Sequence, residues 1–204
     1  MLTLDMVLTY VDALYKAEPG DCPHYDEFRD MFSGGQVQSK QWMISQLKDI
    51  SEVNIGRKKV VVCGAWYGIL SFMLEASFSN FDIASLDLDE RCRKFIGCIK
   101  AYDKFGHRVI AIQENMYDYR YTEDVVINTS GEHIEDLEVW VEKIPTGTVV
   151  VLQSSNFNSH PQHINCVSSA DELLNKAGLQ FKEVIYKGEL QLPTYTRFMV
   201  IFKK

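Results

Sequence analysis

Short apolar runs alternate with segments of helical spacing along most of the chain, and this alternation predicts an α/β fold. The run Val60–Val62 is followed by apolar residues three or four positions apart, namely Ile69, Phe72, Met73 and Ala76. The same succession of strand and helix recurs to about residue 152, so we expect a parallel sheet. The later predicted strands are Phe81–Asp89, Arg108–Gln113, Asp124–Asn128, Thr148–Leu152, Gln180–Tyr186 and Tyr195–Phe202.

The two ends of the chain depart from this alternation. No helix separates the last two predicted strands, and a loop connection of this kind is natural for an antiparallel pair. The first fifty or so residues contain only helical patterns and predict an N-terminal helical cap. The predicted helices of this cap are Met6–Tyr15, His24–Phe32 and Gln36–Ile50. Later in the chain, two more helices are predicted over Ile134–Lys143, within the alternating part, and over Asp171–Ala177.

A glycine-bracketed loop follows the first predicted strand. Gly64 and Gly68 let the backbone turn sharply and approach a ligand without a Cβ in the way. The helix that begins near Gly68 has unpaired N–H groups at its start, and these favour an anionic ligand. Asp87 ends the next strand, nineteen residues after Gly68, where nucleotide-binding βαβ units place a ribose-binding carboxylate. Together these features predict a nucleoside site, and the alternative is an ordinary strand-to-helix turn without a ligand.

Composition narrows the class of protein. At 204 residues and 46% hydrophobic content, the chain has material for one sizeable core, so we expect a single domain over residues 1–204. A formal net charge of −7 without a basic run argues against a surface that holds nucleic acid through phosphate contacts. The five cysteines are scattered, which favours a reducing compartment. With no basic leader and no apolar run of spanning length, we expect a cytoplasmic protein that does not enter a membrane.

From about residue 55 to residue 204, the order of elements resembles the class I S-adenosylmethionine-dependent methyltransferases. The resemblance implies a Rossmann-like three-layer sandwich with a mostly parallel seven-stranded sheet and an antiparallel last strand, here preceded by the helical cap. It also implies S-adenosyl-L-methionine as the cofactor. The residues that it assigns to cofactor binding are Gly64, Ala65, Trp66, Tyr67, Gly68, Asp87, Leu88, Asn115, Met116 and Asn128.

Within that set the resemblance gives individual roles. Asp87 would bind the ribose hydroxyls, Leu88 would lie against the adenine, and Asn115 and Met116 would meet its amino group and flank its ring. The family's first loop reads approximately acidic-x-Gly-x-Gly-x-Gly, and this chain departs from it twice. Val62 stands where the acid is usual and Trp66 where the middle glycine is usual, which leaves recognition of the cofactor's ammonium group unassigned.

The candidate catalytic residues are Asn128, Glu132 and His133. The segment 128–136 resembles the fourth-strand motif of small-molecule and tRNA methyltransferases, in which a Glu-His pair opens the following helix. Both side chains follow a parallel strand at its carboxyl end, where open α/β sheets bind ligands. Methyl transfer needs a base only if the acceptor loses a proton in the transition state. The alternatives are that Glu132 caps the helix and that His133 packs structurally.

Other residues have two readings as well. Trp66 and Tyr67 either edge the cofactor pocket or fill the core, and we favour the core. Lys40 either faces a carboxylate of the cofactor as part of a lid or is solvated, and we favour solvation. His160, His163 and Cys166 are spaced by three, but Pro161 breaks any helix that would gather them, so we expect no metal site.

The expected function is therefore an S-adenosylmethionine-dependent methyltransferase, of the EC 2.1.1 type, acting on a small molecule or on a modified nucleoside or tRNA. Two alternatives stay open. The same fold transfers the aminocarboxypropyl group of the cofactor or the aminopropyl group of its decarboxylated form. It also occurs as a non-catalytic binding subunit. The expected partner is the small-molecule or nucleoside acceptor, without a strong nucleic-acid surface, and the sequence leaves the oligomeric state open.

Overall fold

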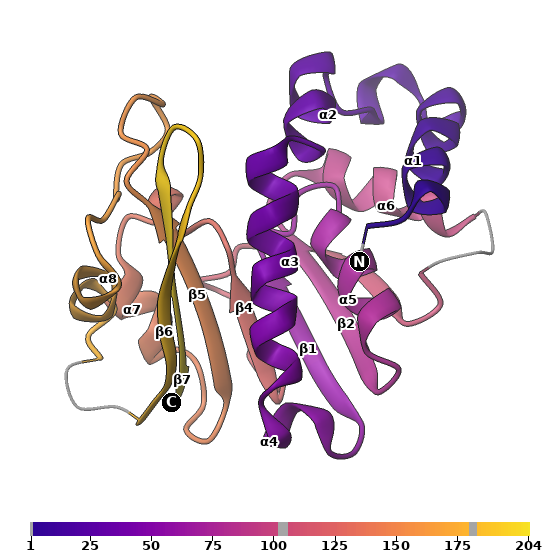
Figure 1. The fold of residues 1–204 in the computed structure, drawn as a ribbon. Coiled ribbons are helices and arrows are strands. Elements are labelled where there is room, and N and C mark those ends of the chain that lie inside the picture. The colour runs from indigo at the N-terminus through magenta and orange to yellow at the C-terminus, as the bar shows by residue number, and fades with distance from the viewer. Residues whose placement is uncertain (1, 102–105, 180–182) are drawn as a thin grey trace. The chain divides into compact units, whose positions relative to one another are not determined.

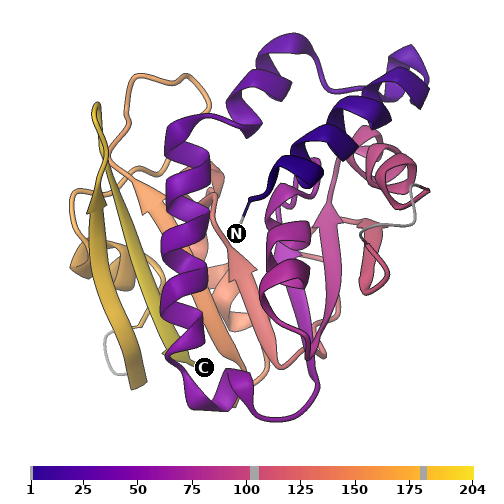
Figure 2. The same ribbon diagram turned by 45° about the vertical axis from the view of Figure 1, so that its right-hand side comes forward.

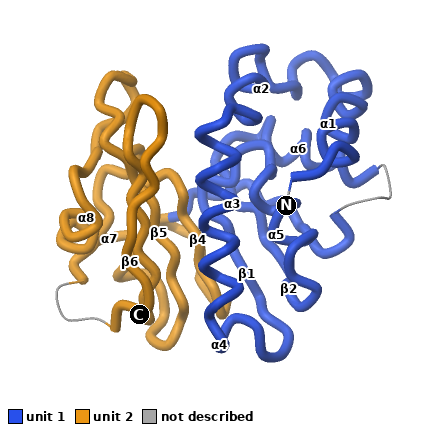
Figure 3. Tube along the Cα trace, in the orientation of Figure 1, with its two compact units in different colours: residues 1–116 blue, residues 117–204 orange. Residues whose placement is uncertain are grey.

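The structure, a computed structural model, describes residues 2–101, 106–179 and 183–204 (Figure 1). The chain forms two compact units, residues 1–116 and residues 117–204 (Figure 3). Whether the chain is a single domain depends on how these two units are joined, so the expectation of one domain stays a prediction. In the described part of the chain, no helix is both long and apolar enough to cross a membrane.

The first unit begins with helices, as the sequence predicted. They are α1 (Leu4–Lys16), the 3₁₀ turn η1 (Pro19–Asp21), α2 (Tyr25–Met31), α3 (Gly34–Lys48) and α4 (Ser51–Asn54). Side chains just outside the helices fix where they begin: the hydroxyl of Thr3 accepts from the N–H of Met6, and that of Ser33 accepts from the N–H of Gln36. The buried face of α1 includes Met6 and Tyr10, four residues apart.

The rest of the first unit alternates strand and helix. It contains β1 (Lys58–Cys63), α5 (Ile69–Ser77), β2 (Phe81–Asp87), α6 (Glu90–Lys100) and β3 (Val109–Gln113). β2 pairs in parallel with β1 on one side and with β3 on the other. The last four residues of β1 are buried, as expected for a strand that is covered on both faces.

The second unit holds the remaining elements. They are β4 (Val125–Asn128), the 3₁₀ turn η2 (Gly131–His133), α7 (Leu137–Glu142), β5 (Val149–Ser155), α8 (Ala170–Lys176), β6 (Glu183–Gln191) and β7 (Thr196–Lys203). β4 and β5 are parallel, whereas β7 is antiparallel to both β5 and β6. The β6–β7 hairpin, drawn in gold to yellow, is seen from two sides in Figures 1 and 2.

The strand order, β3-β2-β1-β4-β5-β7-β6, is that of a seven-stranded, mostly parallel sheet in which the last strand of the chain is antiparallel. With flanking helices, this is the Rossmann-like α/β fold that the sequence predicted. β7 is not at the edge, because β6 pairs with its outer side. The first three residues of the predicted strand 180–186 lie outside the described residues, and the observed strand continues to Gln191.

Two further predicted elements differ from the structure. The predicted strand Thr148–Leu152 continues through Gln153, Ser154 and Ser155, and all three are buried. Polar residues extend this strand because its backbone pairs with β7 as far as Arg197. The predicted helix Ile134–Lys143 is shorter in the structure: a 3₁₀ turn over residues 131–133 precedes it, and α7 begins only at Leu137, where the side chain of Asp136 accepts from the N–H of Val139.

Candidate functional site

The loop between β1 and α5 has the strained backbone that its glycines suggested. Gly64 has a φ of 61° and Gly68 a φ of 81°, both in the left-handed region that favours glycine. Trp66 also has a positive φ, 52°, and among the described residues it is the one non-glycine with this conformation. A Cβ at position 68 would lie 2.9 Å from Cγ1 of Ile96, so Gly68 is required for close packing as well. For a non-glycine residue such as Trp66, this conformation costs about 1–3 kcal/mol and persists only where surrounding contacts enforce it.

Asp87 supplies one of those contacts. Its Oδ2 accepts a hydrogen bond of 2.7 Å from the backbone N–H of Trp66, and its Oδ1 accepts one of 3.0 Å from the N–H of Asp89. Burial raises the pKa of the Asp87 carboxyl above its ordinary value, while these backbone hydrogen bonds lower it in part. The structure thus brings together the glycine loop and the acidic residue at the end of β2, which the sequence analysis had paired by spacing alone.

The loop's own N–H groups are largely engaged within the first unit. Besides the Trp66 N–H, that of Ala65 donates to the carbonyl of Leu86 at 3.0 Å, and that of Gly68 donates to the carbonyl of Ala65 at 2.9 Å. The loop is therefore held in shape by the end of β2. The Asp87 carboxylate keeps an acceptor site beyond those used by the backbone N–H groups of Trp66, Leu88 and Asp89, since an ionised carboxylate has about four acceptor sites.

The helical cap anchors the same loop through Tyr67. This side chain is fully buried, which confirms the prediction that it belongs to the core. The hydroxyl of Tyr10, on α1, donates to the Tyr67 carbonyl at 2.9 Å, and the Tyr67 hydroxyl donates to Oε2 of Glu27, on α2, at 2.9 Å. Burial, followed by Glu27, raises the pKa of Tyr67 far above its ordinary value, so the phenol stays a proton donor.

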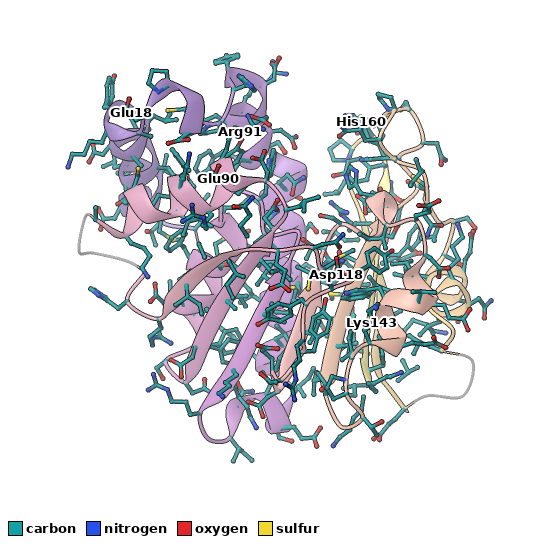
Figure 4. All side chains as sticks on the ribbon, turned by 180° about the vertical axis from the view of Figure 1, so that it is seen from behind. Glu18, Glu90, Arg91, Asp118, Lys143 and His160 are labelled. Carbon is teal, nitrogen blue, oxygen red and sulfur yellow. The ribbon has the colours of Figure 1, made fainter. Side chains whose placement is uncertain are left out.

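Glu27 connects this network to Arg91 and Asp89, in the turn and helix that follow Asp87. Its carboxylate is 3.2 Å from Nη2 of Arg91, labelled in Figure 4, and the same nitrogen is 2.7 Å from Oδ2 of Asp89. Although partial burial alone raises the pKa of Glu27, hydrogen bonds from the His24 N–H and the Tyr67 hydroxyl, together with Arg91, lower it overall. Sequence reasoning missed Glu27 and Arg91, because their partners are 40 and 64 residues away in the chain.

The remaining predicted cofactor residues of the first unit are accessible to different degrees. Leu88 is 68% exposed, although its neighbour Asp87 is half-buried. Trp66 is half-buried, and its ring centroid is 5.6 Å from that of Tyr67. Asn115 and Met116 are also half-buried and follow β3, where the N–H of Glu114 donates to the Asp87 carbonyl at 3.1 Å.

Lys40 was predicted to be solvated, and this was wrong. Only 6% of the residue is exposed, and its ammonium group donates to Oε1 of Gln36 one helical turn earlier on α3. An aliphatic stem of this length covers apolar surface well, so a lysine can be buried along most of its length while its nitrogen keeps a polar partner. The lid role stays a prediction.

In the second unit, the predicted catalytic residues occupy the turn after β4. Asn128 is buried, and its Oδ1 accepts a hydrogen bond of 2.8 Å from the N–H of Ser130, which shapes the turn. Glu132 is only 3% exposed. The proposed alternative, that Glu132 caps a helix, was wrong: η2 has no side-chain cap, and Asp136 caps α7.

Glu132 instead forms a buried ion pair that the sequence analysis did not foresee. Its Oε1 is 2.6 Å from Nη1 of Arg197 on β7, and both side chains are at most 5% exposed. The same Arg197 nitrogen donates to the Thr129 carbonyl at 3.2 Å, and the Ser155 hydroxyl donates to Glu132 Oε1 at 3.4 Å. Glu132 Oε2 is buried without a hydrogen-bond partner. The sequence signal that could have indicated a role for Arg197 is a charged residue near the start of an otherwise apolar predicted strand.

His133 lies next to two more histidines. Its ring centroid is 4.6 Å from that of His163 and 6.3 Å from that of His160. Partial covering of the His133 ring lowers its pKa from the ordinary 6.5, the neighbouring histidines act in the same direction, and Glu132 opposes them. The His133 imidazole is therefore neutral at pH 7 and able to accept a proton. His160 and His163 come from the loop after β5, in which His160 is labelled in Figure 4.

Comparisons with known proteins place the fold. No protein-family model matches the chain, and no curated protein matches it in sequence. Among solved structures, the N-methyltransferase NodS from Bradyrhizobium japonicum WM9, in complex with S-adenosyl-L-homocysteine, matches with a TM-score of 0.65 at 12% identity over 96% of this chain and 98% of that one. Magnesium protoporphyrin IX methyltransferase from Synechocystis PCC 6803, with bound S-adenosylmethionine, matches with a TM-score of 0.66 at 14% identity over 96% and 97%.

The same fold also serves other chemistry. The [4+2]-cyclase SpnF matches with a TM-score of 0.67 at 8% identity, over 85% of this chain and 83% of that one. At identities this low the likeness is one of fold, so it does not decide between reactions. The chain has the fold of the class I S-adenosylmethionine-dependent methyltransferases.

Proposed function

We propose that this chain is an S-adenosylmethionine-dependent methyltransferase whose acceptor is a small molecule or a modified nucleoside or tRNA. The observation that carries the proposal is the junction of the glycine loop with Asp87. The half-buried carboxylate holds the strained Trp66 backbone and still has an acceptor site for a ribose hydroxyl. Leu88, the next residue, offers an exposed apolar surface for a planar base.

The residues fit the adenosine part of the cofactor better than its amino-acid part. Val62 is 1% exposed at the end of β1, so the position where the family usually has an acid offers an ammonium group no partner. Lys40 is a buried cation in the same unit and has the right charge for the cofactor's carboxylate. In this proposal Gly64, Ala65 and Gly68 shape the loop, and Asn115 and Met116 flank the adenine.

The bound cofactor would supply a sulfonium centre that is already a good leaving group. The protein's part is then to position the acceptor, to exclude water and, where the acceptor is protonated, to remove a proton. His133 suits the last task because its imidazole is neutral at pH 7 and accessible. Asn128 and Glu132 serve as positioning residues in the same turn, since both side chains are buried and hydrogen bonded.

The adenosyl site is tested by calorimetric titration of the full chain with S-adenosyl-L-homocysteine. We expect one site per chain in the wild type and at least a tenfold loss of affinity in Asp87→Ala, because the ribose loses its acceptor. Asp82→Ala is the matched control: it lies on the same strand, pairs with Arg57 on the surface, and should leave the affinity unchanged. No binding by the wild type, or equal affinities for all three proteins, contradicts the proposal.

The buried valine at position 62 favours one second candidate, transfer of an aminocarboxypropyl or aminopropyl group. The amino-acid end of the cofactor is the part that such reactions transfer, and it is the end whose partner is missing here. The two reactions leave different products. Parallel incubations with S-adenosylmethionine and with its decarboxylated form, each with an extract of small molecules, are followed by mass spectrometry. S-adenosyl-L-homocysteine from the first indicates methyl transfer, methylthioadenosine from the first indicates aminocarboxypropyl transfer, and methylthioadenosine from the second alone indicates aminopropyl transfer. His133→Ala should lower turnover on the acceptor more than it lowers cofactor affinity.

A further inference from the structure

A cluster of metal-ligating side chains lies in the second unit, between the turn after β4 and the loop after β5. One carboxylate oxygen of Glu132 and one ring nitrogen each of His133 and His163 lie within 4.8 Å of one another. The sequence analysis considered only His160, His163 and Cys166 as ligands and, because Pro161 breaks any helix that would gather them, expected no metal site. In the structure, His163 is instead joined by Glu132 and His133, about thirty positions earlier in the chain.

Glu132 carries the observation that points to a ligand. The residue is 97% buried, and while Oε1 is held by Arg197 and Ser155, Oε2 has no hydrogen-bond partner. A buried acceptor left without a partner costs about 1–3 kcal/mol. A cation bound to Oε2 removes that cost, and the hydrogen bonds on Oε1 hold the carboxylate in place for it.

Both histidines are oriented by backbone contacts that leave a ring nitrogen available. Nδ1 of His163 is 2.6 Å from the Phe157 carbonyl, so it carries the proton and Nε2 has the free lone pair. His133 makes a hydrogen bond to the Gln162 backbone through one ring nitrogen. A histidine that donates one N–H to a carbonyl and presents its other nitrogen is the usual form of a metal ligand.

His160 has the opposite arrangement. Its Nδ1 accepts a hydrogen bond of 3.3 Å from the Gln162 N–H, so in the neutral ring Nε2 bears the proton and is not a ligand. Its ring centroid is 4.8 Å from that of His163, so His160 is a neighbour of the cluster without belonging to it. These hydrogen bonds therefore distinguish the proposed ligands Glu132, His133 and His163 from the neighbouring His160.

We propose that Glu132, His133 and His163 bind a divalent transition-metal ion, with Zn²⁺ the best match. Two histidines and one carboxylate form the protein ligand set of open zinc sites, in which a water or substrate takes the fourth position. Tetrahedral ligands at about 2.1 Å from zinc lie about 3.4 Å apart, so the observed limit of 4.8 Å closes by small side-chain rotations. His133 is exposed and His163 half-exposed, so both rings have room to move and the ion has a path from solvent.

Charge sets an upper limit on the affinity. Arg197 is a cation 2.6 Å from Oε1 of Glu132, and it offsets the carboxylate charge that the metal would otherwise use in full. We therefore expect a site that releases its ion to chelators rather than one required for folding. The metal site does not depend on methyl transfer, but the two roles of His133 exclude each other, because a bound ion takes the ring nitrogen that the proposed function uses as a base.

The test is titration of the full chain with Co²⁺, which substitutes for Zn²⁺ and absorbs visible light in a way that reports its ligands. We expect one Co²⁺ per chain, displaced by Zn²⁺, and an affinity at least 100-fold lower in His163→Ala. The matched control is His160→Ala, a neighbouring histidine of the same loop, which should change the affinity by less than about threefold. Glu132→Gln should also lose binding, but it disturbs the Arg197 pair, so His163→Ala decides.

Absence of Co²⁺ binding by the wild type overturns the proposal, as does equal binding by wild type and His163→Ala. Equal losses in His163→Ala and His160→Ala overturn the assignment of ligands. The His163→Ala protein should still bind S-adenosyl-L-homocysteine as the wild type does. The predicted cofactor-binding residues do not include His163, and all of them except Asn128 belong to the first unit. Failure of the metal site and failure of the proposed cofactor site are therefore distinguishable.

Discussion

The pair Glu132–Arg197 makes the sharpest prediction about stability. Nη1 and Oε1 are 2.6 Å apart, and the two side chains are 4–5% exposed, so neither charge is hydrated. Replacing Arg197 by Met keeps most of the side-chain volume and removes the charge. The Glu132 carboxylate then loses its cation, while Ser155 alone still donates to it.

The expected cost follows from that burial. Removing one partner of a buried ion pair destabilises a protein by about 3–5 kcal/mol, chiefly because the other charge is left uncompensated. For a chain of this length, about 2–4 °C of melting temperature corresponds to each kcal/mol, so Arg197→Met should lower it by roughly 6–20 °C. In the double variant Glu132→Leu/Arg197→Met neither charge remains, and most of the loss should be recovered.

Arg57 and Asp82 provide a matched control. Their Nη2 and Oδ1 atoms are also 2.6 Å apart, but the side chains are 65% and 42% exposed. Water and salt screen such a pair, so Arg57→Met should leave the unfolding midpoint almost unchanged. The assay is urea unfolding followed by far-UV circular dichroism. If Arg197→Met costs no more than Arg57→Met, or if the double variant is as unstable as the single one, the reasoning is refuted.

Three further substitutions test packing and the cap. Tyr10→Phe removes the hydroxyl that donates to the buried Tyr67 carbonyl and should cost about 1–3 kcal/mol in urea unfolding; no loss would show that water replaces the hydroxyl. Gly131→Ala would place a Cβ 2.6 Å from a backbone oxygen and should cost about 1–3 kcal/mol, whereas the exposed helical Gly97→Ala meets no atom within 4 Å and should stabilise by about 0.5–1 kcal/mol; equal effects would contradict the packing. Glu27→Gln should destabilise at pH 7. Because the folded pKa of Glu27 lies below the ordinary 4.5, that difference should shrink as the pH falls from 4.5 through the folded pKa, and a constant difference between pH 7 and pH 3 would refute the network.

The sequence was informative where local pattern decides structure. Alternating apolar runs predicted the strands and the α/β fold, because parallel strands are buried on both faces. Gly64 and Gly68 predicted a sharp turn, and both have the left-handed backbone expected of them. The pairing of this loop with Asp87 was also predictable, since adjacent parallel strands end at the same edge of the sheet.

What the sequence did not reveal depends on partners far along the chain. Glu132 was read as a possible helix cap, but its partner Arg197 is 65 residues away. Gln153 was predicted to lie beyond the end of a strand, yet it belongs to β5 and is fully buried, because β7 supplies a backbone partner for it. His133 and His163 are thirty residues apart, so spacing could not show that they meet. In each case a tertiary contact overrides the preference of the local segment.

A crystal structure of the chain with S-adenosyl-L-homocysteine would test the central claim most directly. Our account predicts the ribose hydroxyls within hydrogen-bond distance of the Asp87 carboxylate, with the base on the exposed side chain of Leu88. A ligand bound elsewhere, or a loop whose Trp66 ring fills the space beside Asp87 while the ligand stays out, would contradict it and leave the fold without the proposed activity.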